Sequence, residues 1–142
     1  MSEQPVRVVF HLDQDRKLVD VFCSAVQHQA LQAGLQAEHG AQLATAAADV
    51  CHETIAKLSG NGEIVDVTLD TFTDRIEIAI HCRSLGLPAV GLDKFALSGS
   101  RSGENRGVSG MELLSRVDRV LYNTDGGVAR TTLVKFLPAY HH

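Results

Sequence analysis

The sequence predicts an α+β fold, a two-layer sandwich in which helices cover one face of a mainly antiparallel sheet. Three observations support this prediction. Short runs rich in β-branched residues stand at both ends and in the middle of the chain, and two long helical patterns follow the first run. The resulting order is strand, helix, helix, strand, strand, loop, helix, strand, strand, which places hairpin neighbours side by side in the sheet.

The first strand is predicted over 6–12 (VRVVFHL), which is β-branched and apolar. The first helix is predicted over 15–33, with Asp13 or Asp15 as its N-cap and Gly34 as its stop signal. The apolar stripe expected along this helix consists of Leu18, Phe22, Ala25, Val26 and Ala30.

A second helix is predicted over 38–58, ended by the SGNG turn at 59–62. Two strands follow at 63–72 and 75–81. The apolar residues of 63–72 do not alternate cleanly, whereas those of 75–81 do. The expected stripe of the second helix is Leu43, Ala47, Val50, Ile55 and Leu58, and the alternating set of the strand is Ile76, Ile78 and Ile80.

The last third of the chain begins with a change in character. The segment 96–107 is polar, rich in Gly and Ser, and without periodicity, so we expect a mobile loop there. A short helix is predicted over 109–116, and strands over 117–123 and 128–137 flank an Asp-Gly-Gly hairpin turn. We find no repeat and no domain boundary, so residues 1–142 are expected to form one domain.

Composition narrows the class of protein. Hydrophobic residues make up 44% and charged residues 21% of the 142 residues, as in one globular domain, and the net charge of -4 argues against general affinity for nucleic acid or acidic membranes. No apolar stretch approaches the length of a spanning helix, and Glu3 stands where a signal peptide needs an apolar run. We therefore expect a cytoplasmic protein without direct contact to nucleic acid or membrane.

The element order, together with the ending VDRVLYNTDGGVARTTLVKFL (117–137) and its Lys135, resembles the family of anti-sigma-factor serine/threonine kinases. The resemblance covers essentially the whole chain. It implies the histidine-kinase-like ATPase fold shared with histidine kinases, gyrase and mismatch-repair proteins, a site for ATP and Mg²⁺, and a homodimer. Family dimers often use the region of the first strand.

The first nucleotide motif of that family falls on the second helix, in DVCHETIAK (49–57). The resemblance makes Asp49 the candidate catalytic base and Glu53, where the family has Asn, a possible Mg²⁺ ligand, with Lys57 one turn later. One-turn spacing puts all three on one helix face. The alternative is a solvated helix face with a favourable pair between Glu53 and Lys57.

The second motif is Asp-x-Gly-x-Gly in the family, and here it reads Cys82, Ser84 and Gly86. The family's Asp accepts a hydrogen bond from the adenine amino group, and cysteine is a poor acceptor. Losing such a charge-assisted bond costs roughly 1.5–3 kcal/mol, or about ten- to a hundredfold in affinity. We therefore expect weak or absent ATP binding.

The third motif is a glycine turn into a helix, which can aim backbone N–H groups at phosphates. Here Gly107, Ser109 and Gly110 keep small residues, and Arg106 adds positive charge, although an ordinary loop-to-helix turn has the same composition. On the last strand the family often has a Thr that faces the base. Counting back from Lys135 gives Arg130 at that position, and Thr131 only if the register shifts by one.

Metal binding by the adjacent pairs Cys51-His52 and His81-Cys82 is not expected, because neighbours on a helix or strand do not point at one ion. Apart from the possible Mg²⁺ at Glu53, no metal site is predicted. Three cysteines cannot all pair internally, and Cys23 fits core packing better than catalysis.

Three functions remain open from the sequence. The first is a regulatory protein of the anti-sigma type that binds a sigma factor or an anti-anti-sigma-type switch protein, with weak or lost use of ATP. The second is an ATP-dependent kinase that phosphorylates such a switch protein, and the third is a dimer-forming scaffold. The departures at Glu53 and Cys82 favour the first. A candidate partner surface is formed by apolar residues without core periodicity, namely Leu85, Leu87, Val90 and Leu92; the alternative is that these residues pack under the loop that follows them.

Overall fold

The computed structural model describes residues 4–12, 15–57, 64–83, 113–125 and 128–138. Its elements are β1 (Val6–His11), α1 (Arg16–Gln32), α2 (Ala37–Lys57), β2 (Ile64–Thr71), β3 (Arg75–Arg83), β4 (Arg119–Asp125) and β5 (Val128–Phe136).

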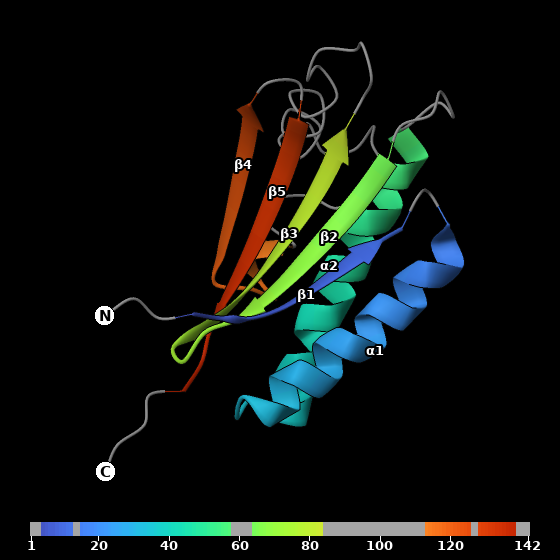
Figure 1. The fold of residues 1–142 in the computed structure, drawn as a ribbon. Coiled ribbons are helices and arrows are strands. Elements are labelled where there is room, and N and C mark those ends of the chain that lie inside the picture. The colour runs from blue at the N-terminus through green and yellow to red at the C-terminus, as the bar shows by residue number, and fades with distance from the viewer. Residues whose placement is uncertain (1–3, 13–14, 58–63, 84–112, 126–127, 139–142) are drawn as a thin grey trace.

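The five strands form one sheet in the order β1-β2-β3-β5-β4, and every neighbouring pair is antiparallel. Figure 1 shows α1 and α2 on the same face of this sheet, with β1 and β4 at its two edges. The predicted α+β architecture, with helices on one face of an antiparallel sheet, is therefore confirmed. β1, the region that the family resemblance associates with dimers, forms one edge of the sheet.

The core lies between the helices and the central strands. Along β3, Ile76, Ile78 and Ile80 are buried, as their alternation predicts. In β2, Val65 and Leu69 are fully buried together with Val67 between them, so this strand also alternates toward the helices despite its irregular sequence pattern. We call this side of the sheet the helix face and the opposite side the open face.

The first helix begins and ends where its local signals predict. Of the two candidate N-caps, Asp15 is the cap, because its carboxylate accepts a 2.9 Å hydrogen bond from the backbone N–H of Lys17. Gly34 follows the helix with φ = 104°, a conformation that glycine adopts without a Cβ clash. The buried residues of α1 are Val19, Phe22, Val26 and Ala30, whereas the predicted Leu18 and Ala25 are half-buried.

The second helix packs closely against the first. A Cβ added at Gly40 would lie 3.2 Å from the Cβ of Ala30, so the glycine permits the close approach of α1 and α2. The predicted stripe is buried at Leu43, Ala47, Val50 and Ile55, while Leu58 and the turn at 59–62 lie outside the described residues.

The C-terminal part of the chain adds the hairpin β4–β5. Of the helix predicted over 109–116, residues 113–114 are helical and 115–116 form a turn, and the rest lies outside the described residues together with the predicted loop 96–107. Leu113 and Val117 anchor this segment in the core. The strands pair as far as Asp125 with Val128, so β4 continues beyond the predicted end at 123 and includes the Asp of the predicted Asp-Gly-Gly turn.

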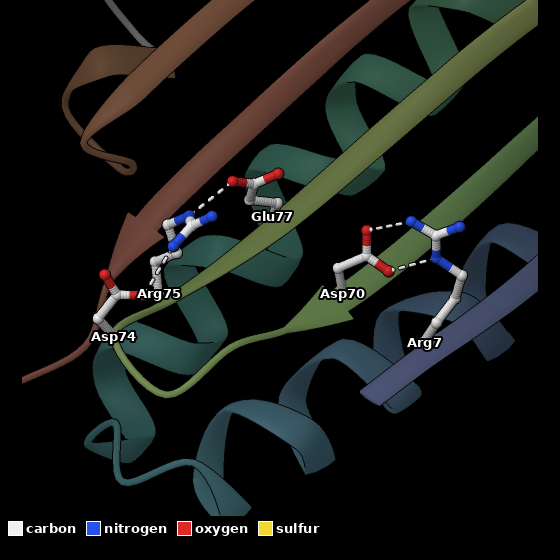
Figure 2. A network of polar contacts seen from close by, with 5 residues as sticks. All are labelled: Arg7, Asp70, Asp74, Arg75 and Glu77. Atoms are coloured by element: carbon white, nitrogen blue, oxygen red, sulfur yellow. Dashed lines mark hydrogen bonds and ion pairs between the residues drawn. The ribbon is translucent and has the colours of Figure 1, made fainter. Parts of the chain in front are cut away.

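The open face carries the charged residues of the central strands. Arg7 makes two hydrogen bonds to Asp70, at 2.7 and 3.0 Å, and Arg75 bonds Glu77 at 2.6 Å and Asp74 at 2.8 Å. Figure 2 shows these side chains on the side of the sheet turned away from the helices. Among the described helices none is long and apolar enough to cross a membrane.

Candidate functional site

Asp49, the candidate base, lies on α2 and is held by an arginine that is distant in sequence. Nη1 of Arg116 donates a hydrogen bond to Oδ2 of Asp49 at 2.6 Å, and both side chains are about one-third exposed, at 31% and 36%. Arg116 belongs to the turn that Leu113 and Val117 fix in the core, since its backbone N–H donates to the Leu113 carbonyl at 2.9 Å. The ion pair therefore joins α2 to the segment that leads into β4.

Glu53 lies one turn further along α2 and is only 9% exposed. Burial raises the pKa of the Tyr122 phenol, and the nearby Glu53 carboxylate raises it further. Tyr122 pairs with Thr131 across β4 and β5, and Thr131 is buried. Glu53 is therefore buried and near enough to Tyr122 to affect its phenol, and the alternative of a solvated helix face is wrong for this residue.

On the last strand, the structure separates the two residues that sequence counting left open. Thr131 pairs with Ile80 of β3 and, like it, is buried on the helix face. Arg130 precedes it, is exposed and faces the other side of the sheet. Thr131, rather than Arg130, thus lies on the side of the sheet where Glu53 is found.

Cys82 is the residue that the family resemblance aligns with an adenine-binding acid. It lies near the end of β3, is half-buried, and pairs with Val65 on one side and Ala129 on the other. By strand alternation it shares the helix face with Ile80, one pair further along the strand. Cys82 and Thr131 are therefore diagonal neighbours on the same face of β3 and β5, roughly 7–8 Å apart.

Most of the other predicted site residues lie outside the described residues. Lys57 is the last residue of α2. The remaining predicted nucleotide residues are Ser84, Gly86, Arg106, Gly107, Ser109 and Gly110, and the predicted partner surface is Leu85, Leu87, Val90 and Leu92; all fall within 84–112. The structure thus brings Asp49 and Glu53 to one side of α2 and places Cys82 and Thr131 on the sheet face below.

Sequence reasoning missed Arg116 and Tyr122. A signal for Tyr122 was present, because alternation along β4 places it with Val120 on the helix face. No local signal pointed to Arg116, since its partner stands 67 residues away.

The cysteines have the properties of packed residues. Burial, with smaller contributions from Asp20 and Asp49, raises the pKa of Cys23 to about 11, and its Sγ donates to the Ala44 carbonyl at 3.5 Å. Burial also raises the pKa of Cys51. Because the thiolate is the reactive form, both side chains are poor nucleophiles at neutral pH. Within the described part of the chain, no group of three or more His, Cys, Asp or Glu side chains is arranged to hold a metal ion.

Comparison with known proteins identifies neither a family nor a curated relative. No protein-family model matches the chain, and no curated protein sequence matches it.

Proposed function

We propose that this chain is a regulatory domain with the histidine-kinase-like ATPase fold, which acts by binding a sigma factor or an anti-anti-sigma-type switch protein and makes weak or no use of ATP. The fold part of the proposal is supported by the resemblance of the C-terminal hairpin and by the strand order β1-β2-β3-β5-β4 with both long helices on one face.

The observation that carries the proposal is that Asp49 is held in an ion pair and Glu53 is buried. Oδ2 of Asp49 is occupied by the Arg116 guanidinium, so a proton acceptor at this oxygen would first have to give up an ion pair. Glu53 is 9% exposed, whereas Mg²⁺ keeps several of its waters and needs room for them. The described residues therefore do not fit a tightly held Mg²⁺–ATP.

Phosphoryl transfer depends on this positioning. Catalysis of that reaction comes almost entirely from placing the phosphates and the metal and from stabilising their charge. Glu53 in place of an amide adds negative charge beside the phosphates, and Cys82 lacks the charged acceptor for adenine. Binding of a partner protein needs none of these contacts.

The experiment is a titration of the purified protein with sigma factors and switch proteins from the same cell, with and without ATP and Mg²⁺. We expect saturable binding of one of them that is independent of ATP and is retained by Asp49→Ala. The companion variant Leu87→Asp tests the predicted partner surface and should weaken binding while the thermal transition is retained. If no such protein binds, the regulatory proposal is wrong.

The kinase is the second candidate, and one observation favours it. Asp49 keeps about one-third of its side chain exposed and stands one turn from Glu53, which is the spacing that the resemblance gives to the base and the Mg²⁺ ligand. A kinase would transfer labelled phosphate from ATP to the bound switch protein, and Asp49→Ala would abolish the transfer. That result would replace the proposal above.

A further inference from the structure

The edge strand β4 presents backbone groups to the outside of the sheet. The Leu137 N–H donates to the Asp74 carbonyl at 2.9 Å, which continues the register between β3 and β5. Since a residue in an antiparallel ladder points both backbone groups to one side, the even-numbered residues of β5 bond to β4. Their partners on β4 are odd-numbered, so the backbone groups of Val120 and Thr124 point away from β5.

The side chains beside this edge combine one apolar residue with two cations. On the open face, Leu121 is 48% exposed and lies midway between Arg119 and the Asn123–Arg130 pair. Arg119 and Arg130 are both exposed, and neither forms an ion pair within the described ranges; Arg119 lies over the Phe136 ring at 5.8 Å. The cross-strand pairs that contain the two arginines, Arg119–Val134 and Asn123–Arg130, are four residues apart along the strands, or about 13–14 Å.

At the other edge of the sheet, β1, the basic side chains already have acidic partners. On β1 the two basic side chains are already bonded to β2, Arg7 to Asp70 at 2.7 Å and His11 to Asp66 at 2.8 Å. Figure 2 shows the Arg7–Asp70 pair lying across the two strands. Carboxylates thus satisfy the charged groups at β1, whereas the arginines near β4 lack such partners in the described chain.

From this charge arrangement we propose that β4 docks an extended acidic segment of a partner protein as a sixth, antiparallel strand. The segment has the pattern acidic–x–apolar–x–acidic, with its apolar residue opposite Leu121, one acid opposite Arg119 and the other opposite Asn123, whose partner on β5 is Arg130. The proposal rests on the proposed function only in that a partner protein binds; it requires neither ATP nor the ATPase fold.

Strand addition accounts for both parts of the surface. Backbone hydrogen bonds to Val120 and Thr124 supply affinity, and alternate side chains supply specificity. In an antiparallel pairing, the residues opposite Arg119, Leu121 and Asn123 form the non-hydrogen-bonded pairs, in which side chains approach most closely. The protein as a whole carries a net charge of -4, which repels acidic segments from most of its surface. The two arginines at this edge attract such segments, and this contrast directs them to β4.

The test uses two labelled peptides, TETLTET and TKTLTKT, and fluorescence anisotropy at low and high salt. Wild-type protein should bind TETLTET saturably at concentrations up to about 1 mM and bind TKTLTKT much more weakly, with the difference falling as salt rises. The double variant Arg119→Glu/Arg130→Glu should bind TETLTET about tenfold more weakly, as expected for two exposed ion pairs. It should also gain affinity for TKTLTKT, which an unfolded variant would not do.

Two controls separate strand addition from loose charge attraction. The single reversals Arg119→Glu and Lys17→Glu change the net charge equally. The first should weaken binding of TETLTET, whereas the second, on α1, should leave it unchanged. N-methylation of the peptide threonine opposite Val120 removes an inward hydrogen bond and should abolish binding, whereas N-methylation of the central leucine, whose N–H points outward, should not.

Equal binding of both peptides by wild type, or equal effects of the two N-methyl groups, would overturn the proposal. If the double variant does not fold, these two wild-type comparisons decide. A sigma factor or switch protein that binds wild type and the double variant equally would also overturn this surface, yet it would leave the proposed function standing. If the peptide binds as expected but no sigma factor or switch protein binds, the β4 surface would stand and the proposed function would be wrong.

Discussion

At the level of single residues, the chemistry open to this protein depends on what surrounds two carboxylates of α2. Asp49 is paired with Arg116 at 2.6 Å, and Glu53 is enclosed near Tyr122. An exposed ion pair of this kind contributes on the order of 1 kcal/mol or less to stability. The Asp49–Arg116 pair matters more for function than for stability, because Arg116 occupies the Asp49 oxygen that would have to act as the base in a nucleotide site.

The adenine position gives the first prediction at this scale. Replacing Cys82 by Asp together with Ser84→Gly should raise affinity for ATP by about ten- to a hundredfold, because a charged acceptor is restored on the helix face of β3. Calorimetric titration measures the gain. The variant Cys82→Asn with Ser84→Gly is the control, since it has an acceptor without the charge. Equal affinity of the double variant and wild type would show that the adenine position is misplaced or blocked.

Cys23 gives a second prediction, in the pH dependence of stability. Its pKa is raised from 9.0 to about 11 in the fold, so between these values the folded state holds a proton that the unfolded state has lost. The free energy of unfolding should therefore fall as the pH rises from about 9 to about 11. Urea unfolding across this range should show a shallower fall in Cys23→Ala. An identical slope in both proteins would contradict the assigned burial of the thiol.

At the level of elements, β1 is an edge strand whose charged side chains do not shield it. The Leu12 N–H donates to the Val65 carbonyl at 2.8 Å, in register with β1 and β2, so the even-numbered residues of β1 bond to β2. Arg7, Val9 and His11 therefore turn their backbone groups outward. We propose that the expected homodimer forms by antiparallel pairing of two copies about Val9, which would use all three.

Val9→Lys tests this pairing. Val9 is 49% exposed at the middle of the edge, and lysine on an edge strand discourages pairing with another strand. We expect wild type to sediment as a dimer and Val9→Lys to shift toward monomer, with an unchanged circular dichroism spectrum. Val21→Lys, at a 53% exposed position on α1, is the matched control and should stay dimeric. A monomeric wild type, or equal shifts in both variants, would rule out this dimer.

At the level of the whole molecule, the sequence was most informative where local rules decide the structure. Alternation at Ile76, Ile78 and Ile80 and the stop at Gly34 are local signals, and the structure confirms both. The strand assignments followed from the same kind of pattern, and with them the antiparallel sheet.

The site was less predictable, because its contacts join distant parts of the chain. The Asp49–Arg116 pair spans 67 residues, and no spacing rule connects its members. The burial of Glu53 depends on tertiary packing around α2, which helix periodicity alone does not specify. The register of Thr131 was likewise settled by pairing with Ile80 rather than by counting along β5.

The central claim is that this protein regulates by binding a partner and has little or no use for ATP. Calorimetric titration of the purified wild-type protein with ATP in the presence of Mg²⁺ tests it most directly. We expect weak heat without saturation, or none, because Asp49 is held by Arg116, Glu53 is enclosed and Cys82 lacks the charged acceptor. Saturable binding with a dissociation constant below about 1 μM, roughly -8 kcal/mol, would contradict the account.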